Sequence, residues 1–305
     1  MLDGHSFALC LTHDVDRPYK TYQSGYYAVT ERDASHLTAA FRGKNPYWQF
    51  EELLALEDSL DVRSAFYFLD EQNLFRDRPV RDWIEPGNWK RYVGRYDLSD
   101  PNIVDLIREL DDGGWEVGLH GSYESYDDPE RLADEKQRIE SILGDEVIGG
   151  RQHYLNLDVP ETWRHHADLG LKYDASLGSS STYGFQYGDS IHRPFGDEFV
   201  VFPLTIMEVA LPSPTDHLER AWRECRGILD EAREREAITT ILWHPRYFSG
   251  TDFPGYRELY RRIIEYALEA GAWVGPPADL YDRLDHPPEP SDGTATDDHA
   301  ATSSH

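Results

Sequence analysis

The sequence is short of lysine, cysteine and methionine, and it has no long apolar run. It contains 5 lysines beside 25 arginines, and only two cysteines and two methionines, in 305 residues. Two cysteines exclude a disulfide framework and a thiolate metal cluster. The first apolar stretch, 7–11, is too short for a signal-peptide core or a membrane span. We therefore expect a cytoplasmic protein in which Cys10 and Cys225 are small core residues.

Positive charge is scarce, and negative charge is abundant. The 30 Lys and Arg residues stand against 57 Asp and Glu, which gives a formal net charge of −27. Nucleic acids and anionic membranes are bound by basic faces, so this balance excludes both as partners. Many aspartates with few lysines resemble the surfaces of proteins from halophiles that accumulate salt, where molar salt screens the repulsion. The hydrophobic content of 39% is enough for a packed core.

Short apolar runs alternate with segments of helical period. The runs predict strands at 7–11, 65–69, 117–119, 147–148, 200–206, 238–242 and 273–274. The periodic segments predict helices at 101–110, 216–237 and 256–268, with Asp100 and Asp216 at N-cap positions and Gly271 after the last turn. This alternation indicates a parallel α/β barrel or a doubly wound sheet. No glycine-rich nucleotide fingerprint follows a strand, which favours the barrel.

We expect one catalytic domain over 1–285. The segment 286–305 is rich in Pro, Asp, Ser and Thr without apolar periodicity, which predicts a disordered acidic tail. Two long aromatic segments, 17–43 and 70–99, interrupt the alternation. Long loops of this kind are often functional, so their rings are expected either to stack on a substrate or to pack against the barrel.

Polar side chains gather where several predicted strands end. Asp14 and Asp16 follow the first apolar run, and three further runs end near His120, His153 and His244. In a parallel barrel the carboxyl ends of the strands meet at one mouth. Paired carboxylates and imidazoles at such a mouth have metal-binding chemistry. The pattern therefore predicts an active site there.

The order of these motifs, from about Phe7 to Leu284, resembles the NodB-type polysaccharide deacetylases of carbohydrate esterase family 4. The resemblance implies a distorted (β/α) barrel and a metal-dependent hydrolase of carbon–nitrogen bonds other than peptide bonds. Thr12-His13-Asp14-Val15-Asp16 is similar to the family's first motif, which makes Asp14 the general base and Asp16 a metal ligand. The second motif makes His120 a metal ligand.

The later motifs imply three further roles. Arg151 matches the arginine that holds the catalytic aspartate, and Asp174 falls where the family orients its catalytic histidine. Leu242-Trp243-His244 is similar to the fifth motif, which makes His244 the general acid. In this chemistry a divalent ion, expected to be zinc, lowers the pKa of bound water, and the acid protonates the leaving amine.

The sequence departs from the family at the third metal ligand. The family's second motif has another histidine four residues after the first, where this chain has Glu124. Either His153 or Glu124 could complete the shell, and we favour His153 because it would restore two imidazoles and one carboxylate. The fourth motif also lacks the family's tryptophan, so the resemblance does not establish an acetyl pocket in this chain.

We expect N-deacetylation of an N-acetylated sugar in a polysaccharide or glycan precursor. Within the same chemistry, the alternative is hydrolysis of a small cyclic amide or ureide. From another class, the alternative is an inactive, metal-containing barrel that binds carbohydrate, which Glu124 would support.

Overall fold

A computed structural model describes residues 4–20, 45–93, 95–196 and 198–284. The predicted tail at 286–305 and most of the first aromatic loop lie outside these residues. Within them, none of the helices is long and apolar enough to cross a bilayer.

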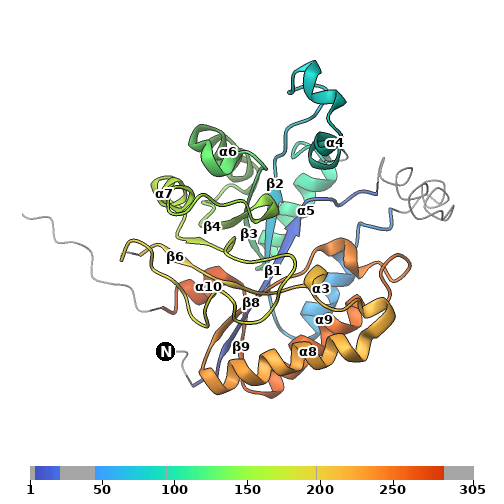
Figure 1. The fold of residues 1–305 in the computed structure, drawn as a ribbon, viewed down its shortest axis with the longest axis vertical. Coiled ribbons are helices and arrows are strands. Elements are labelled where there is room, and N and C mark those ends of the chain that lie inside the picture. Colours follow the sequence, from blue (N-terminus) through green and yellow to red (C-terminus); the bar gives the residue numbers. More distant parts are fainter. Residues whose placement is uncertain (1–3, 21–44, 94, 197, 285–305) are drawn as a thin grey trace, which may run out of the picture.

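The core is a curled, parallel sheet in which β1 lies at the centre (Figure 1). The strands run in the order β6-β5-β4-β3-β2-β1-β8-β7, and β9 pairs with the first residues of β1. Their bounds are β1 Ala8–Val15, β2 Ala65–Leu69, β3 Glu116–Gly121, β4 Gly149–Gln152, β5 Tyr173–Asp174, β6 Val200–Val201, β7 Leu204–Met207, β8 Ile238–Leu242 and β9 Trp273–Gly275. The protein is a single-domain, distorted (β/α) barrel, as the sequence predicts.

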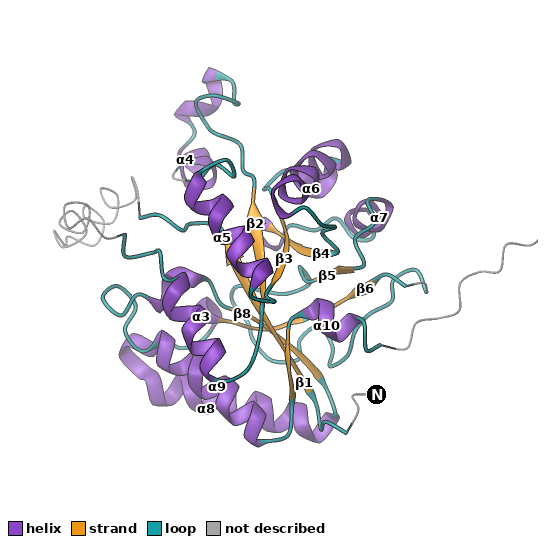
Figure 2. Cartoon of the chain, turned by 180° about the vertical axis from the view of Figure 1, so that it is seen from behind, coloured by secondary structure: helices purple, strands orange, loops and turns teal. Residues whose placement is uncertain are grey.

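Helices cover the outside of the sheet (Figures 1 and 2). Their bounds are α3 Phe50–Ser59, α4 Pro86–Tyr92, α5 Pro101–Asp112, α6 Pro129–Leu143, α7 Glu161–Asp168, α8 Pro214–Arg235, α9 Tyr256–Glu269 and α10 Pro277–Tyr281. Asp100 caps α5 by accepting from the Asn102 backbone N–H, as predicted. The predicted cap Asp216 is wrong, because α8 begins two residues earlier, after Ser213.

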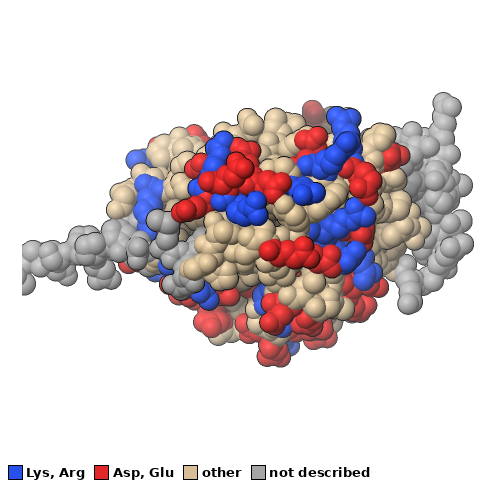
Figure 3. All heavy atoms as spheres, turned by 90° about the horizontal axis from the view of Figure 1, so that it is seen from below, with Lys and Arg blue, Asp and Glu red and all other residues tan. Residues whose placement is uncertain are grey.

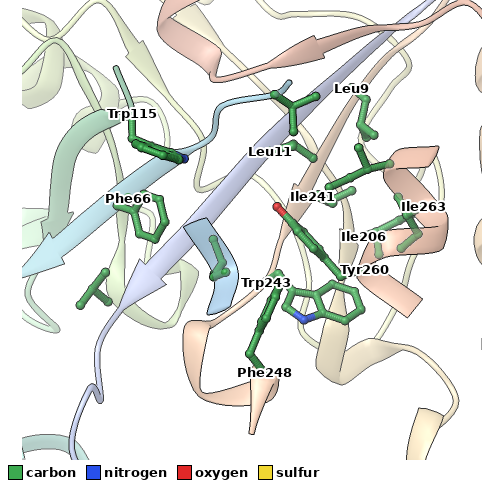
Figure 4. Packing of buried hydrophobic residues seen from close by; sticks show 14 of the residues in the cluster. Leu9, Leu11, Phe66, Trp115, Ile206, Ile241, Trp243, Phe248, Tyr260 and Ile263 are labelled. Carbon is green, nitrogen blue, oxygen red and sulfur yellow. The ribbon is translucent and has the colours of Figure 1, made fainter. Parts of the chain in front are cut away.

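Alternation along β1 sends its side chains to two different places. Leu9 and Leu11 pack beneath the helices with residues such as Ile241 and Tyr260 (Figure 4). Ala8 and Cys10 belong instead to a second apolar cluster, inside the barrel, with residues such as Tyr67 and Phe202. Because side chains alternate along a strand, Thr12, Asp14 and Asp16 face the same side as Ala8 and Cys10. The first motif therefore places both carboxylates on the barrel side and His13 on the helix side.

Some strand boundaries differ from the prediction. β1 continues to Val15, so the first four residues of the first motif lie within the strand and Asp16 follows it directly. β4 begins at Gly149, one residue after the predicted run, because its two glycines carry no apolar signal. The run at 200–206 forms two strands separated by Phe202 and Pro203, since proline lacks the backbone N–H that a ladder needs. The two-residue β5 was not predicted, and 70–99 contains α4 rather than only loop.

Candidate active site

The carboxyl ends of β1, β3, β4 and β8 meet at one edge of the sheet. β1 pairs with β8 on one side and β2 on the other, and β3 and β4 follow in order. The parallel pairing of these strands therefore places Asp14, His120, Arg151 and His244 near one another at this edge of the sheet. All four side chains are buried.

Asp14 is paired with Arg151, as predicted. Arg151 Nη1 lies 2.8 Å from Asp14 Oδ1 and 2.9 Å from Thr12 Oγ1, and Nε donates to the Ala175 carbonyl. Burial favours the neutral carboxyl, but the charges of His120 and Arg151 outweigh it and lower the pKa of Asp14. The side chain is therefore an ionised, fixed acceptor at neutral pH.

His120 and His153 lie side by side, with ring centroids 5.1 Å apart. His120 Nδ1 faces the Arg151 carbonyl at 2.9 Å, and its Nε2 lies 3.7 Å from Asp14 Oδ2. His153 Nδ1 lies 3.2 Å from Glu71 Oε2. Burial and the charge of Arg95 hold the pKa of His153 well below its usual value, so this ring is neutral.

Asp16 is surrounded by arginines. Arg246 Nη1 donates to Oδ1 at 2.5 Å, and Arg95 Nη1 lies 3.3 Å from Oδ2. Burial would raise the pKa of Asp16, but these cations and His244 hold it well below the usual range. The predicted metal ligand is thus an ionised carboxylate with both oxygens engaged by guanidinium groups.

His244 is oriented by Glu208, and the assignment of this role to Asp174 needs correction. His244 Nδ1 lies 2.6 Å from Glu208 Oε1, and the glutamate is fully buried. Asp174 instead accepts from Ser176 and Trp163, and His166 Nδ1 lies 3.3 Å from it. The reason is the strand order: β7, which precedes Glu208, is the neighbour of β8, whereas β5 lies beyond β1.

Glu124 lies apart from the predicted metal shell. It accepts from Arg78 Nη1 at 2.5 Å and from the Tyr92 hydroxyl at 3.0 Å, and it is partly exposed. His13 also lies elsewhere, in a buried network with Glu57 and Tyr260. His166 is buried beside Gln152.

The donor groups, as arranged, do not fit a divalent ion. Two ligands about 2.0–2.1 Å from a tetrahedral ion lie roughly 3.4 Å apart. Asp16 Oδ2 and His153 Nε2 are 4.0 Å apart, and Arg95 donates to both. Across the described ranges, no three His, Cys, Asp or Glu side chains are grouped to hold a metal.

A small hollow lies beside these groups. Its empty space is about 150 Å³ but is too narrow to hold a water molecule, and it is lined in part by Asp14, Asp16, Arg17 and Arg246. The arrangement brings a fixed carboxylate, an oriented imidazole and several cations together at the mouth.

No family model and no curated protein matches this sequence. Solved structures do match. A candidate polysaccharide deacetylase from Mycobacterium smegmatis has a TM-score of 0.59 at 18% identity, over 92% of this chain and 91% of that one. Puue allantoinase has a TM-score of 0.57 at 14% identity, over 92% and 90%. The chain has the polysaccharide deacetylase fold.

Within this deacetylase-type barrel, three residues of the site were not assigned from the sequence. Glu208 stands two residues after a predicted buried strand, and Arg246 stands two residues after His244, so position along the chain could have indicated both. Arg95 comes from the long segment 70–99. Nothing in its spacing relates it to Asp16, because the contact depends on how that segment folds back over the mouth.

Proposed function

We propose that the protein hydrolyses carbon–nitrogen bonds other than peptide bonds. The observation that carries the proposal is the pair of oriented groups at the mouth: Asp14 fixed by Arg151, and His244 fixed by Glu208. A base and an acid, each held by a charged partner, are what amide hydrolysis requires. The fold, common to a candidate deacetylase and an allantoinase, is consistent with this chemistry.

The reaction divides between these two pairs. Asp14 accepts a proton from water as the water oxygen bonds to the carbonyl carbon. The carbon–nitrogen bond then breaks, and His244 gives a proton to the leaving nitrogen, so that water and amide become acid and amine. Arg246, which lines the hollow and bonds Asp16, contributes positive charge to the site as negative charge develops on the carbonyl oxygen.

A divalent ion, expected to be zinc, was implied by the family resemblance. Asp16 and His153 hold Arg95 instead, so every step falls to side chains of the chain itself.

Two substrate classes follow from this chemistry. The first is an N-acetylated sugar of a polysaccharide or glycan precursor, which the motif resemblance favours. The second is a small cyclic amide or ureide, which Arg17 and Arg246 beside Asp14 favour because guanidinium groups donate to carbonyl oxygens.

Direct assays on the purified chain test the proposal. Acetate release from N-acetylglucosamine oligomers would be measured beside ring opening of a panel of cyclic amides and ureides, in molar KCl. The Asp14→Asn variant should lose turnover by about 10²-fold or more. Asp105→Asn, at an exposed site on α5, is the matched control and should retain it. Undiminished turnover in Asp14→Asn, or no turnover of either class by the folded wild type, would overturn the proposal.

A further inference from the structure

The Arg95 guanidinium is held at four points inside the site. Nη1 lies 3.1 Å from the Asp16 carbonyl oxygen and 3.3 Å from Asp16 Oδ2. Nη2 lies 3.2 Å from His153 Nε2, and Nε donates to the Arg91 carbonyl at 2.8 Å. Only 3% of the side chain is exposed. A buried cation with this many partners is a fixed part of the site and not a mobile surface group.

The contact with His153 defines which ring nitrogen accepts. Arginine has only donors, so His153 Nε2 must present its lone pair to Arg95. The other nitrogen, Nδ1, then carries the proton and donates to Glu71. A carboxylate behind one nitrogen and a lone pair on the other is the arrangement that metal-binding histidines use. Here that lone pair points at a guanidinium.

Asp16 is committed in the same way. One of its oxygens accepts from Arg246 at 2.5 Å, and the other faces Arg95. A metal ion bound between Asp16 and His153 would have to displace the Arg95 side chain and break its bonds to both. It would also have to draw the two ligands together from their separation of 4.0 Å.

We propose that Arg95 takes the place of a divalent ion as the resident cation of this site, so that the chain binds no metal between Asp16 and His153. Without a metal-bound hydroxide, the proton of the attacking water passes to Asp14 alone. This consequence for turnover rests on the proposed function, but the occupancy of the site does not.

Metal binding measured without an activity assay tests the proposal. Wild type, Arg95→Ala and the control Arg138→Ala, whose guanidinium bonds Asp70 at the surface, would be stripped with a chelator and titrated with Co²⁺. Bound metal would be quantified by elemental analysis, and the visible ligand-field bands of Co²⁺ would report histidine and carboxylate ligation. Wild type and Arg138→Ala should bind no Co²⁺ with these bands. Arg95→Ala should bind one Co²⁺ ion at least tenfold more tightly than wild type, on the order of 1.4 kcal/mol. The double variant with His153→Ala should lose this binding.

Two outcomes would overturn the proposal. One is a wild-type chain that holds one ion per chain and loses it on Asp16→Ala. The other is a folded Arg95→Ala chain that gains no affinity over wild type. If that variant does not fold, Arg95→Gln, which retains a donor of shorter reach, takes its place, and the wild-type measurement stands on its own.

Turnover measurements distinguish a failure of this proposal from a failure of the proposed hydrolase function. Turnover that a chelator abolishes and Zn²⁺ restores would remove the role of Arg95 and leave the hydrolase in place. An inactive wild type that nonetheless shows the expected metal-binding pattern would remove the hydrolase and leave Arg95 as the resident cation.

Discussion

At the scale of single residues, the site consists of charged pairs that fix one another. Glu208 is fully buried, and its carboxylate bonds Nδ1 of His244. Such a carboxylate fixes the tautomer and the orientation of an imidazole ring. If His244 is the general acid, its orientation depends on Glu208.

Replacing Glu208 by glutamine tests that dependence. We expect Glu208→Gln to lower kcat by about 10²-fold or more. Steady-state rates of purified variants would measure this loss. The control is Asp174→Asn, which removes a buried carboxylate without touching His244 and should retain kcat; a larger loss in Asp174→Asn than in Glu208→Gln would restore the role of Asp174.

The residue types of the site were predictable, but two of their partners were not. Asp14, Arg151 and His244 carry recognisable motifs, and the contact between the first two is present. The partner of His244 depends on which strand lies beside β8, and strand order is not written in local sequence. Arg95 reaches Asp16 across 79 residues of chain, so no spacing rule could have joined them.

At the scale of elements, β4 places Arg151, and it lies very close to its neighbours. A Cβ atom on Gly149 would stand 1.9 Å from the ring of Tyr173, and one on Gly150 would stand 2.2 Å from the Leu119 carbonyl oxygen. Tyr173 cannot move aside easily, because its hydroxyl bonds Glu116 and Tyr67. The two glycines therefore allow β4 to fit between β3 and β5.

A single methyl group should disturb this packing. We expect Gly149→Ala to lower the free energy of unfolding by roughly 1–3 kcal/mol, the usual cost of overpacking. The control is Gly227→Ala in α8, where nothing lies within 4 Å of the added Cβ. That change should raise stability by up to about 1 kcal/mol, because alanine favours helix. Urea unfolding would measure both, and equal effects of the two variants would contradict this account of β4.

The same glycines explain why elements were predicted unevenly. Strands such as β1 and β8 contain apolar runs and were found, although β1 continues four residues further into its polar motif. β4 reads Gly-Gly-Arg-Gln and β5 has two residues, so neither has a periodic apolar pattern. Their positions are fixed by pairing with neighbours, which only the assembled sheet provides.

At the scale of the whole molecule, the dominant property is the negative charge. Acidic and basic side chains are interleaved on the face seen in Figure 3. On α9, for example, Arg261 and Arg262 both bond Glu258. Such exposed pairs contribute little individually. Even if every Lys and Arg had an acidic partner, 57 − 30 = 27 carboxylates would be left over. Their mutual repulsion opposes the compact state.

This repulsion predicts that salt stabilises the fold. The Debye length falls from about 10 Å at 0.1 M to about 3 Å at 1 M salt, so distant carboxylates stop interacting. We therefore expect the midpoint of thermal unfolding to rise as KCl increases from roughly 0.1 M into the molar range.

Salt also strengthens apolar burial, so the charge effect needs its own control. Neutralising three exposed carboxylates of α5, with Asp105→Asn, Glu109→Gln and Asp112→Asn, removes part of the repulsion without changing the core. This triple variant should gain more stability over wild type in dilute buffer than in molar KCl, whereas sucrose, which acts by exclusion from the surface, should leave the difference between the two chains unchanged. If the difference is the same at every salt concentration, or if wild type is most stable in dilute buffer, then repulsion among the surplus carboxylates does not limit the stability of this barrel.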